Sequence, residues 1–359
     1  MTTTRRIFLK ALVGASIANI PGSLFSLAPH TAQAAMAPAD FGEVRGLTIR
    51  CVSEVGWFDT QIIGDDVRKA GGMFTDQYEI PFSAENAAGY SALLLLEALD
   101  GTEHSYLLDT GWSTTWMDHA FAKSGVDAML ENHGLDGLIV SHDHNDHFWG
   151  IESTLKLWPD IPIYHPSTMQ AKSFELLDGA DFSSLSGNPR NRFPHFGQRI
   201  PVYPNELCVP LPGLAIAMFD VNIPLGVRGE SVVYVKVKDK GYVVITGCGH
   251  PGIGTLIDFA ANTFAGGDQM YGCYGGLHIA PFEMWQPEMQ LSIDKIQASG
   301  MQKVACNHCT GRVWTKKALE QGIPIVQGTD AFRSYDRIVK NDPGTGANLY
   351  IGNGDHVRF

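Results

Sequence analysis

Apolar residues along this chain recur mainly at the short spacing of buried strands, and polar turns separate the runs. Segments 90–99 and 104–108 flank an Asp-Gly turn, and this arrangement predicts two paired strands. A second pair is expected over 232–237 and 242–245, around a Lys-Asp-Lys-Gly turn. Antiparallel strands should therefore form a large part of the core.

Helix-length segments and short apolar runs alternate elsewhere. Helices are predicted near 113–123, 149–157, 254–261, 287–297 and 314–321, and strands near 161–164, 270–274, 303–306 and 323–326. Hairpins combined with alternating strands and helices indicate an α/β protein with mixed sheets.

One short segment, Ser141-His142-Asp143-His144-Asn145-Asp146-His147, concentrates the chemistry. It follows an apolar run and precedes the predicted helix at 149–157. Imidazole and carboxylate are the usual ligands of zinc and of non-haem iron or manganese. A tight loop between two rigid elements can aim such ligands at one or two ions. The sequence therefore predicts a metal site here.

A carboxylate also ends the preceding apolar strand. Asp109 stands before Thr110-Gly111, where aspartate is commonly a turn residue. It could instead be a hydrogen-bond acceptor behind the ligands that orients the histidines. We favour the second role, because the histidine cluster follows about thirty residues later.

The HxHxDH pattern at His142, His144, Asp146 and His147, with Asp109 before it, resembles the metallo-β-lactamase superfamily. Three later segments, 246–253, 275–278 and 307–311, resemble its branch of dihydropterin–aminobenzene-phosphate synthase-like metallo-hydrolases. The resemblance implies an αββα four-layer sandwich, which we expect over residues 51–359.

The resemblance also indicates how distant residues complete the site. The residues expected to bind metal are His142, His144, Asp146, His147, Cys248, His250 and His308. Cys248 stands where many relatives carry a bridging aspartate, and its thiolate would make the site softer. The isolated histidine that relatives place between these motifs is not obvious, so His165 or His250 would have to serve.

These ligands predict a metal-dependent hydrolase that uses a metal-bound hydroxide on an ester, lactone, amide or phosphoester of a small molecule. Asp146 is expected to bind metal and to orient the hydroxide. His278 is a candidate ligand, proton donor or substrate contact. One or two zinc ions are expected, with iron or manganese as alternatives. The rival functions are a mononuclear iron oxygenase of the same fold and a noncatalytic metal-dependent binding protein.

The pattern loosens between residues 166 and 229, where glycine, serine and asparagine are frequent. We expect this segment to be a lid insertion, with Phe193, His195 and Phe196 as substrate contacts. The alternative is a surface excursion held by an aromatic anchor.

The N-terminus predicts export. Arg5 and Arg6 precede a mildly apolar stretch, and Ala32-Gln33-Ala34 resembles a cleavage site, so residues 1–34 read as a twin-arginine signal peptide. We expect a periplasmic or otherwise exported protein that uses the twin-arginine machinery, without stable membrane insertion after processing. An uncleaved anchor is the alternative, and residues 35–50 are expected to form a linker.

Composition limits the partners. The 359 residues are 44% hydrophobic and 18% charged, and the net charge is −12, which argues against nucleic-acid binding. Six cysteines permit disulfides in an oxidising compartment. Cys306 and Cys309 form a CxxC spacing, but a single such pair is a weak signal for a redox or zinc motif.

Overall fold

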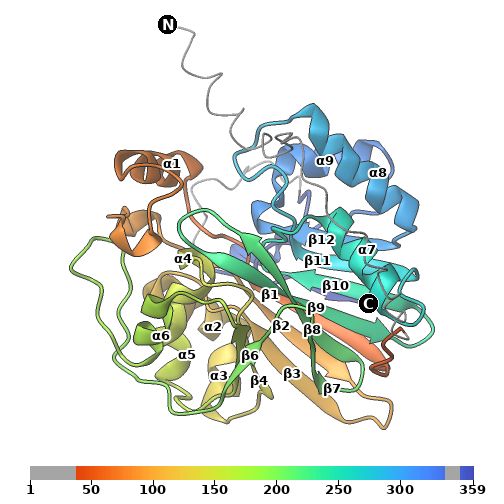
Figure 1. The fold of residues 1–359 in the computed structure, drawn as a ribbon, viewed down its shortest axis with the longest axis horizontal. Coiled ribbons are helices and arrows are strands. Elements are labelled where there is room, and N and C mark those ends of the chain that lie inside the picture. The colour runs from red at the N-terminus through yellow and green to blue at the C-terminus, as the bar shows by residue number, and fades with distance from the viewer. Residues whose placement is uncertain (1–37, 336–347) are drawn as a thin grey trace, which may run out of the picture. The chain divides into compact units, whose positions relative to one another are not determined.

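The computed structural model describes residues 38–335 and 348–359. The predicted signal peptide at 1–34 lies outside the described residues. Two β-sheets form the centre of the described chain, and helices cover their outer faces (Figure 1).

The first sheet has seven strands in the order β13-β1-β2-β3-β4-β5-β6. Their bounds are β1 Gly46–Ser53, β2 Ser91–Glu97, β3 Glu103–Leu108, β4 Gly137–Ile139, β5 Ile163–Pro166, β6 Arg199–Val202 and β13 His356–Arg358. The second sheet has the order β12-β11-β10-β9-β8-β7. Its strands are β7 Leu207–Leu211, β8 Leu214–Asn222, β9 Arg228–Val237, β10 Gly241–Thr246, β11 Met270–Gly276 and β12 Lys303–Asn307.

Helices lie in two groups, with α7, α8 and α9 together on one side of the sheets in Figure 1. The helices are α1 Thr60–Lys69, α2 Thr114–Ser124, α3 Val126–Glu131, α4 Asn145–Phe148, α5 Glu152–Leu155, α6 Ala171–Leu177, α7 Ile253–Thr263, α8 Gln290–Ser299 and α9 Arg312–Glu320. Short 3₁₀ turns occur at Gln77–Glu79, Ala84–Asn86, Trp149–Ile151, Pro287–Met289, His308–Thr310 and Asp330–Tyr335.

Strand β2 shows why its sequence is continuously apolar. Leu94 packs into the core between the two sheets, with Ile216 and Ile245 of the second sheet. Its neighbour Leu93 points the other way, into the core shared with helix α2. Successive side chains of a strand face opposite sides, so a strand covered on both faces needs apolar residues throughout. Each buried leucine contributes about 1.5–3 kcal/mol.

A third core lies between the second sheet and its helices, where Val244 packs with Ile257 and Trp314. Three apolar cores between four layers confirm the predicted αββα arrangement. Both predicted hairpins are present, as β2–β3 and β9–β10.

The parallel strands determine where a site can form. Strand β4 runs parallel to β3 in the first sheet, and β11 runs parallel to β10 and β12 in the second. Parallel strands end at the same edge, so the loops that follow them lie near one another. The histidine loop follows β4, and the other candidate ligands follow β10, β11 and β12.

Three segments differ from the prediction, namely 38–50, 323–326 and 166–229. Residues 38–50 are no linker, because Val44 is fully buried and β1 begins at Gly46. The segment 323–326 forms only an isolated bridge between Val304 and Ile325.

The 166–229 segment is no single lid. It contains helix α6 and strands β6, β7 and β8, which complete the sheets, and its irregular part runs between α6 and β6. In the described part of the chain, no helix combines the length and apolarity needed to span a bilayer.

Candidate metal centre

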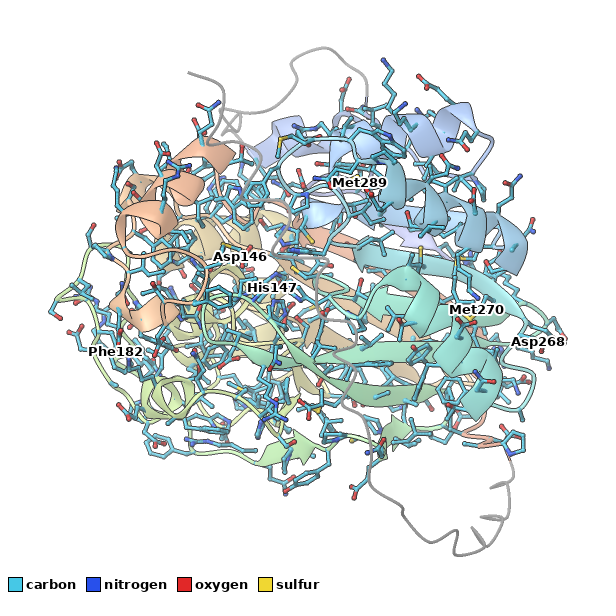
Figure 2. The ribbon with its side chains drawn as sticks, turned by 45° about the horizontal axis from the view of Figure 1, so that its top comes forward. Asp146, His147, Phe182, Asp268, Met270 and Met289 are labelled. Carbon is cyan, nitrogen blue, oxygen red and sulfur yellow. The ribbon has the colours of Figure 1, made fainter. Side chains whose placement is uncertain are left out.

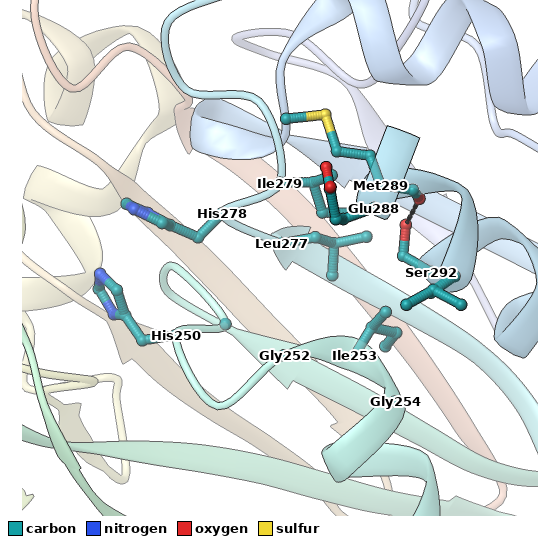
Figure 3. Close-up of a pocket in the computed structure, with 12 residues that line it drawn as sticks. His250, Gly252, Ile253, Gly254, Leu277, His278, Ile279, Glu288, Met289 and Ser292 are labelled. Carbon is teal, nitrogen blue, oxygen red and sulfur yellow. Dashed lines mark hydrogen bonds between the residues drawn. The ribbon is translucent and has the colours of Figure 1, made fainter. Parts of the chain in front are cut away.

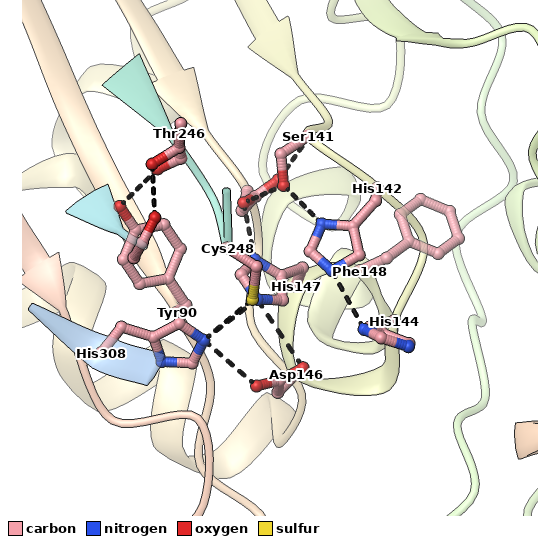
Figure 4. Close-up of polar contacts among 12 residues, drawn as sticks. Tyr90, Ser141, His142, His144, Asp146, His147, Phe148, Thr246, Cys248 and His308 are labelled. Atoms are coloured by element: carbon pink, nitrogen blue, oxygen red, sulfur yellow. Dashed lines mark hydrogen bonds and ion pairs between the residues drawn. The ribbon is translucent and has the colours of Figure 1, made fainter. Parts of the chain in front are cut away.

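Five histidines share one arrangement: a ring nitrogen is held by a protein group, and the other faces the centre of the site. Figure 4 shows four of them, His142, His144, His147 and His308. The holding contacts are His142 Nδ1 with Ser141 Oγ at 2.9 Å, His144 Nε2 with the Pro224 carbonyl at 2.9 Å, His147 Nδ1 with Asp109 at 2.8 Å, His250 Nδ1 with Glu230 at 2.9 Å, and His308 Nδ1 with the Glu54 carbonyl at 3.0 Å. Groups behind metal-binding histidines play this orienting role.

The first group of inward atoms belongs to His142, His144 and His250, whose ligand atoms lie within 4.8 Å of one another. Nε2 of His142 is 3.0 Å from Nδ1 of His144. Nε2 of His250 is buried and has no hydrogen-bond partner among the described residues. The three nitrogens can therefore share one cation.

The second group consists of Asp146, His147 and His308, again within 4.8 Å. Nε2 of His147 is 3.1 Å from Nε2 of His308, and Oδ2 of Asp146 is 3.5 Å from the same His308 nitrogen. Sγ of Cys248 lies 3.1 Å from Nε2 of His147. Figure 2 places Asp146 and His147 near the middle of the molecule.

Burial sets the protonation of these groups. It lowers the pKa of His142 and His147 well below the ordinary value, and that of His144 to about 3. Neutral imidazole is the form that binds metal. Burial also raises the pKa of Asp146 to about 6. Oδ2 of Asp146 accepts no hydrogen bond among the described residues, and a bound cation would satisfy it.

The donor set therefore fits a divalent cation. Space for it depends on Gly56, because a Cβ there would clash with the Asp146 carboxylate and lie 2.6 Å from Cε1 of His308. No local pattern around Gly56 marks this role.

Asp109 holds the histidine loop from behind. Its carboxylate accepts hydrogen bonds from the backbone N–H and the hydroxyl of Ser141, both at 2.7 Å, as well as contacting His147. Its φ of 60° lies in the left-handed region, which aspartate tolerates better than most residues. The geometry therefore gives Asp109 the orienting position that we favoured.

Glu230 of β9 plays a similar part behind the second loop. Its buried carboxylate accepts hydrogen bonds from the backbone N–H groups of Cys248, Gly249 and His250 at 2.7–3.0 Å. These bonds and His250 hold the pKa of Glu230 below its ordinary value, although burial opposes this. Glu230 was not among the residues predicted for the site, although a carboxylate next to the apolar run at 232–237 was a usable signal.

Cys306 and Cys309 have different neighbours, although the CxxC spacing places them close together in the sequence. Sγ of Cys306 faces the Thr315 hydroxyl at 3.8 Å, whereas Cys309 lies against Cys248 and His278. All six cysteines are free thiols. Burial raises the pKa of Cys309, but hydrogen bonds with Cys248 and His278 outweigh this and lower it to about 6.

The predicted substrate contacts lie elsewhere. Nε2 of His195 contacts the Ile161 carbonyl at 2.7 Å, and the backbone N–H of Phe196 donates to Pro159. Both partners precede β5, whereas the metal loop follows the parallel strand β4, so these residues lie at the opposite end of the sheet. Phe193 belongs to the same segment and is partly exposed. We therefore withdraw the substrate role of Phe193, His195 and Phe196.

His165, the alternative ligand, is also separate from the site. Its Nδ1 contacts the carbonyl of Pro166, and its ring packs against Phe174. Of the two histidines considered for the remaining ligand position, His250 lies with His142 and His144.

A pocket of about 360 Å³ opens beside His250 and His278 (Figure 3). The two imidazoles lie next to each other, with ring centroids 4.5 Å apart. Most of the other lining is apolar or glycine, including Ile253, Leu277 and Met289.

Parts of the chain are similar to known proteins. The model of the metallo-beta-lactamase superfamily matches residues 89–205. The chain is 21% identical over 257 residues to 7,8-dihydropterin-6-methyl-4-(beta-D-ribofuranosyl)-aminobenzene-5'-phosphate synthase of Methanocaldococcus jannaschii, covering 65% of this chain and 84% of that protein. It is 29% identical over 80 residues to hydroxyacylglutathione hydrolase of Hamiltonella defensa, covering 22% and 28%.

Among solved structures, a metal-dependent hydrolase of the beta-lactamase superfamily aligns over 78% of this chain and 95% of its own length, with 18% identity and a TM-score of 0.47. The stretch that the family model matches includes the HxHxDH loop and Asp109.

Proposed function

We propose that this protein is a metal-dependent hydrolase that cleaves an ester, lactone, amide or phosphoester of a small molecule. One observation carries the proposal. Three buried histidines and two half-buried ones each use one nitrogen for a protein contact and direct the other into a shared centre beside a buried carboxylate. Histidines that only pack in a protein core do not direct several ring nitrogens at one point.

Two neighbouring cation positions fit these residues. His142, His144 and His250 would hold one ion, and Asp146, His147 and His308, with Cys248 beside them, would hold the other. Imidazole-rich sets with a carboxylate suit zinc best, and they also accept iron or manganese. When bound, such ions acidify a coordinated water and polarise a carbonyl or phosphoryl oxygen.

The protein's own groups supply the proton chemistry. The carboxylate of Asp146 has two oxygens, so it can bind the second cation through Oδ2 and accept a hydrogen bond from a nearby water through the other oxygen. His278 lines the pocket next to His250, so its ring can contact a substrate bound there.

The pocket supports a substrate with an apolar part. Ile253, Leu277 and Met289 form an apolar wall next to His250 and His278, and Glu288 adds a carboxylate to the lining. An uncharged or cationic group would bind there better than an anionic one. The synthase reaction named for the Methanocaldococcus relative is not assigned, because 21% identity does not transfer a specific substrate.

The experiment is to purify the protein, measure its metal content and assay a panel of esters, lactones, β-lactams and phosphodiesters. His142→Ala and Asp146→Asn should reduce hydrolysis about 100-fold or more and lower the bound metal. The exposed His356→Ala is the control and should change neither. Unchanged metal content and rate in both site variants would overturn the ligand assignment. Bound iron with oxygen consumption and no hydrolysis would instead favour the oxygenase.

We further propose that the protein is exported by the twin-arginine route. Arg5 and Arg6 before the apolar stretch support this proposal. Replacing both arginines with lysine should retain the protein in the cytoplasm, and N-terminal sequencing of wild-type protein should give a mature start after Ala34. An intact N-terminus in exported protein would contradict cleavage at this position.

A further inference from the structure

We propose that Cys248, His278 and Cys309 form an additional, sulfur-rich cation position beside the histidine–carboxylate centre, suited to soft divalent cations. This position requires two thiols that the sequence separates by sixty residues. It does not depend on whether the protein hydrolyses any substrate.

The topology brings the three residues together. Cys248 follows β10, His278 follows β11 and Cys309 follows β12, and these are adjacent parallel strands. Their loops therefore emerge side by side at one edge of the second sheet. Two thiol sulfurs and one imidazole nitrogen lie within 4.8 Å of one another.

Because Gly276 has no side chain, these loops can lie close together. A Cβ at Gly276 would lie 2.7 Å from Sγ of Cys309 and 3.1 Å from Cα of Cys248. Gly276 therefore lets both cysteines approach the β11 backbone. Cys309 also directs its Sγ to the Cys248 carbonyl at 3.5 Å, which links the two loops directly.

His278 closes the third side. Its φ of 44° places a non-glycine residue in the left-handed region, a strained conformation that is concentrated at functional sites. His278 also lines the pocket, which gives a cation a route from solvent (Figure 3).

The donor chemistry separates this position from the centre. The centre offers imidazole and carboxylate, which accept many divalent metals, whereas two thiols with one imidazole select zinc, cadmium and other soft ions. Sγ of Cys248 also faces His147 and His308, so the two positions would share this sulfur (Figure 4).

Cadmium titration of chelator-stripped, fully reduced protein tests the proposal. Wild-type protein should show a strong ultraviolet thiolate-to-cadmium charge-transfer band. Cys309→Ala should lose about half of that band and about one equivalent of bound Cd²⁺. Cys273→Ala is the matched control, because Cys273 is an equally buried free thiol within β11, and it should leave both quantities unchanged. Wild-type band intensity and stoichiometry in Cys309→Ala would overturn the proposal.

Two further measurements keep the result decisive. If Cys309→Ala does not fold, X-ray absorption of zinc-loaded wild-type protein replaces that comparison. A fraction of the bound zinc should have two sulfur ligands at about 2.3 Å. A signal with at most one sulfur per zinc would overturn the proposal. A His142→Ala/His144→Ala variant should keep the full cadmium band. Its retention separates the sulfur-rich position from the His142–His144–His250 position, and its loss would show that the sulfur-rich position does not exist by itself.

Discussion

Nε2 of His147 lies 3.1 Å from Nε2 of His308, although 161 residues separate them in the chain. Each ring uses its other nitrogen for a hydrogen bond, to Asp109 and to the Glu54 carbonyl respectively. Burial lowers the pKa of both imidazoles, so two neutral rings point their remaining nitrogens at each other. Two unprotonated nitrogens that face each other destabilise the fold, and a cation bound to both of them would stabilise it.

Metal removal should therefore destabilise the folded protein. An ion that binds only the folded state raises the free energy of unfolding by about 2.7 kcal/mol at about 100 times its dissociation constant. Urea unfolding with chelator and with added Zn²⁺ measures this difference. Equal midpoints under the two conditions would contradict metal binding at the centre.

Asp109→Asn should weaken metal binding without disturbing the backbone, because asparagine also tolerates a positive φ. The variant loses the anionic acceptor of the His147 N–H and of Ser141. We expect zinc affinity to fall about 10–100-fold, as is typical for residues behind metal ligands. Competition with a chromogenic chelator measures it, and the exposed Asp100→Asn serves as the control.

Glu230→Gln should destabilise the loop that carries Cys248 and His250. The amide that replaces the carboxylate brings its own N–H donors to a position facing three backbone donors and the His250 ring. Leaving a buried donor unpaired costs about 1–3 kcal/mol, so we expect a loss of that size in unfolding free energy. Hydrogen exchange should become faster at Cys248 and His250, and unchanged protection there would argue against this role.

Gly56→Ala should reduce metal binding through size alone. The added methyl group would collide with the Asp146 carboxylate and approach Cε1 of His308. Gly64→Ala is a matched control, because a Cβ at Gly64 meets nothing within 4 Å and helix α1 favours alanine over glycine by about 0.5–1 kcal/mol. We expect at least about a tenfold loss of zinc affinity for the first variant only. Calorimetric titration of both proteins decides the point.

His195 should make stability depend on pH. Its Nε2 contacts the Ile161 carbonyl and its Nδ1 accepts from Arg199, so protonation would set a second N–H against a guanidinium. Burial, and to a lesser degree Arg199, lowers the pKa of His195 below the ordinary 6.5. Because the folded pKa is the lower one, the stabilisation is complete above pH 6.5 and is lost as the pH falls below it.

His195→Gln should therefore flatten the decline in unfolding free energy below pH 6.5, by at most about 1.4 kcal/mol per pH unit. The exposed His356→Gln should leave the slope unchanged. Parallel slopes for wild-type protein and His195→Gln would show that His195 does not titrate in this range.

Local patterns were sufficient for most elements of the fold. The apolar run through Leu93 and Leu94 predicted a strand, and the structure confirms that strand and shows it to be covered on both faces. The predicted strand at 323–326 failed because Pro324 has no N–H to donate, so only a bridge to Val304 forms.

The chemistry of the histidine loop follows from the local sequence alone. Ligand type and spacing are local properties, and the strand before His142 fixes which way that loop leaves the sheet. The groups that surround the loop depend on the folding of the whole chain. Gly56, Glu230 and Cys309 gain their roles from contacts that span many residues, and one-dimensional spacing carries no information about such contacts. The same limit explains the error at Phe193 and Phe196, because a loop over a site and a loop at the far end of a sheet have similar compositions.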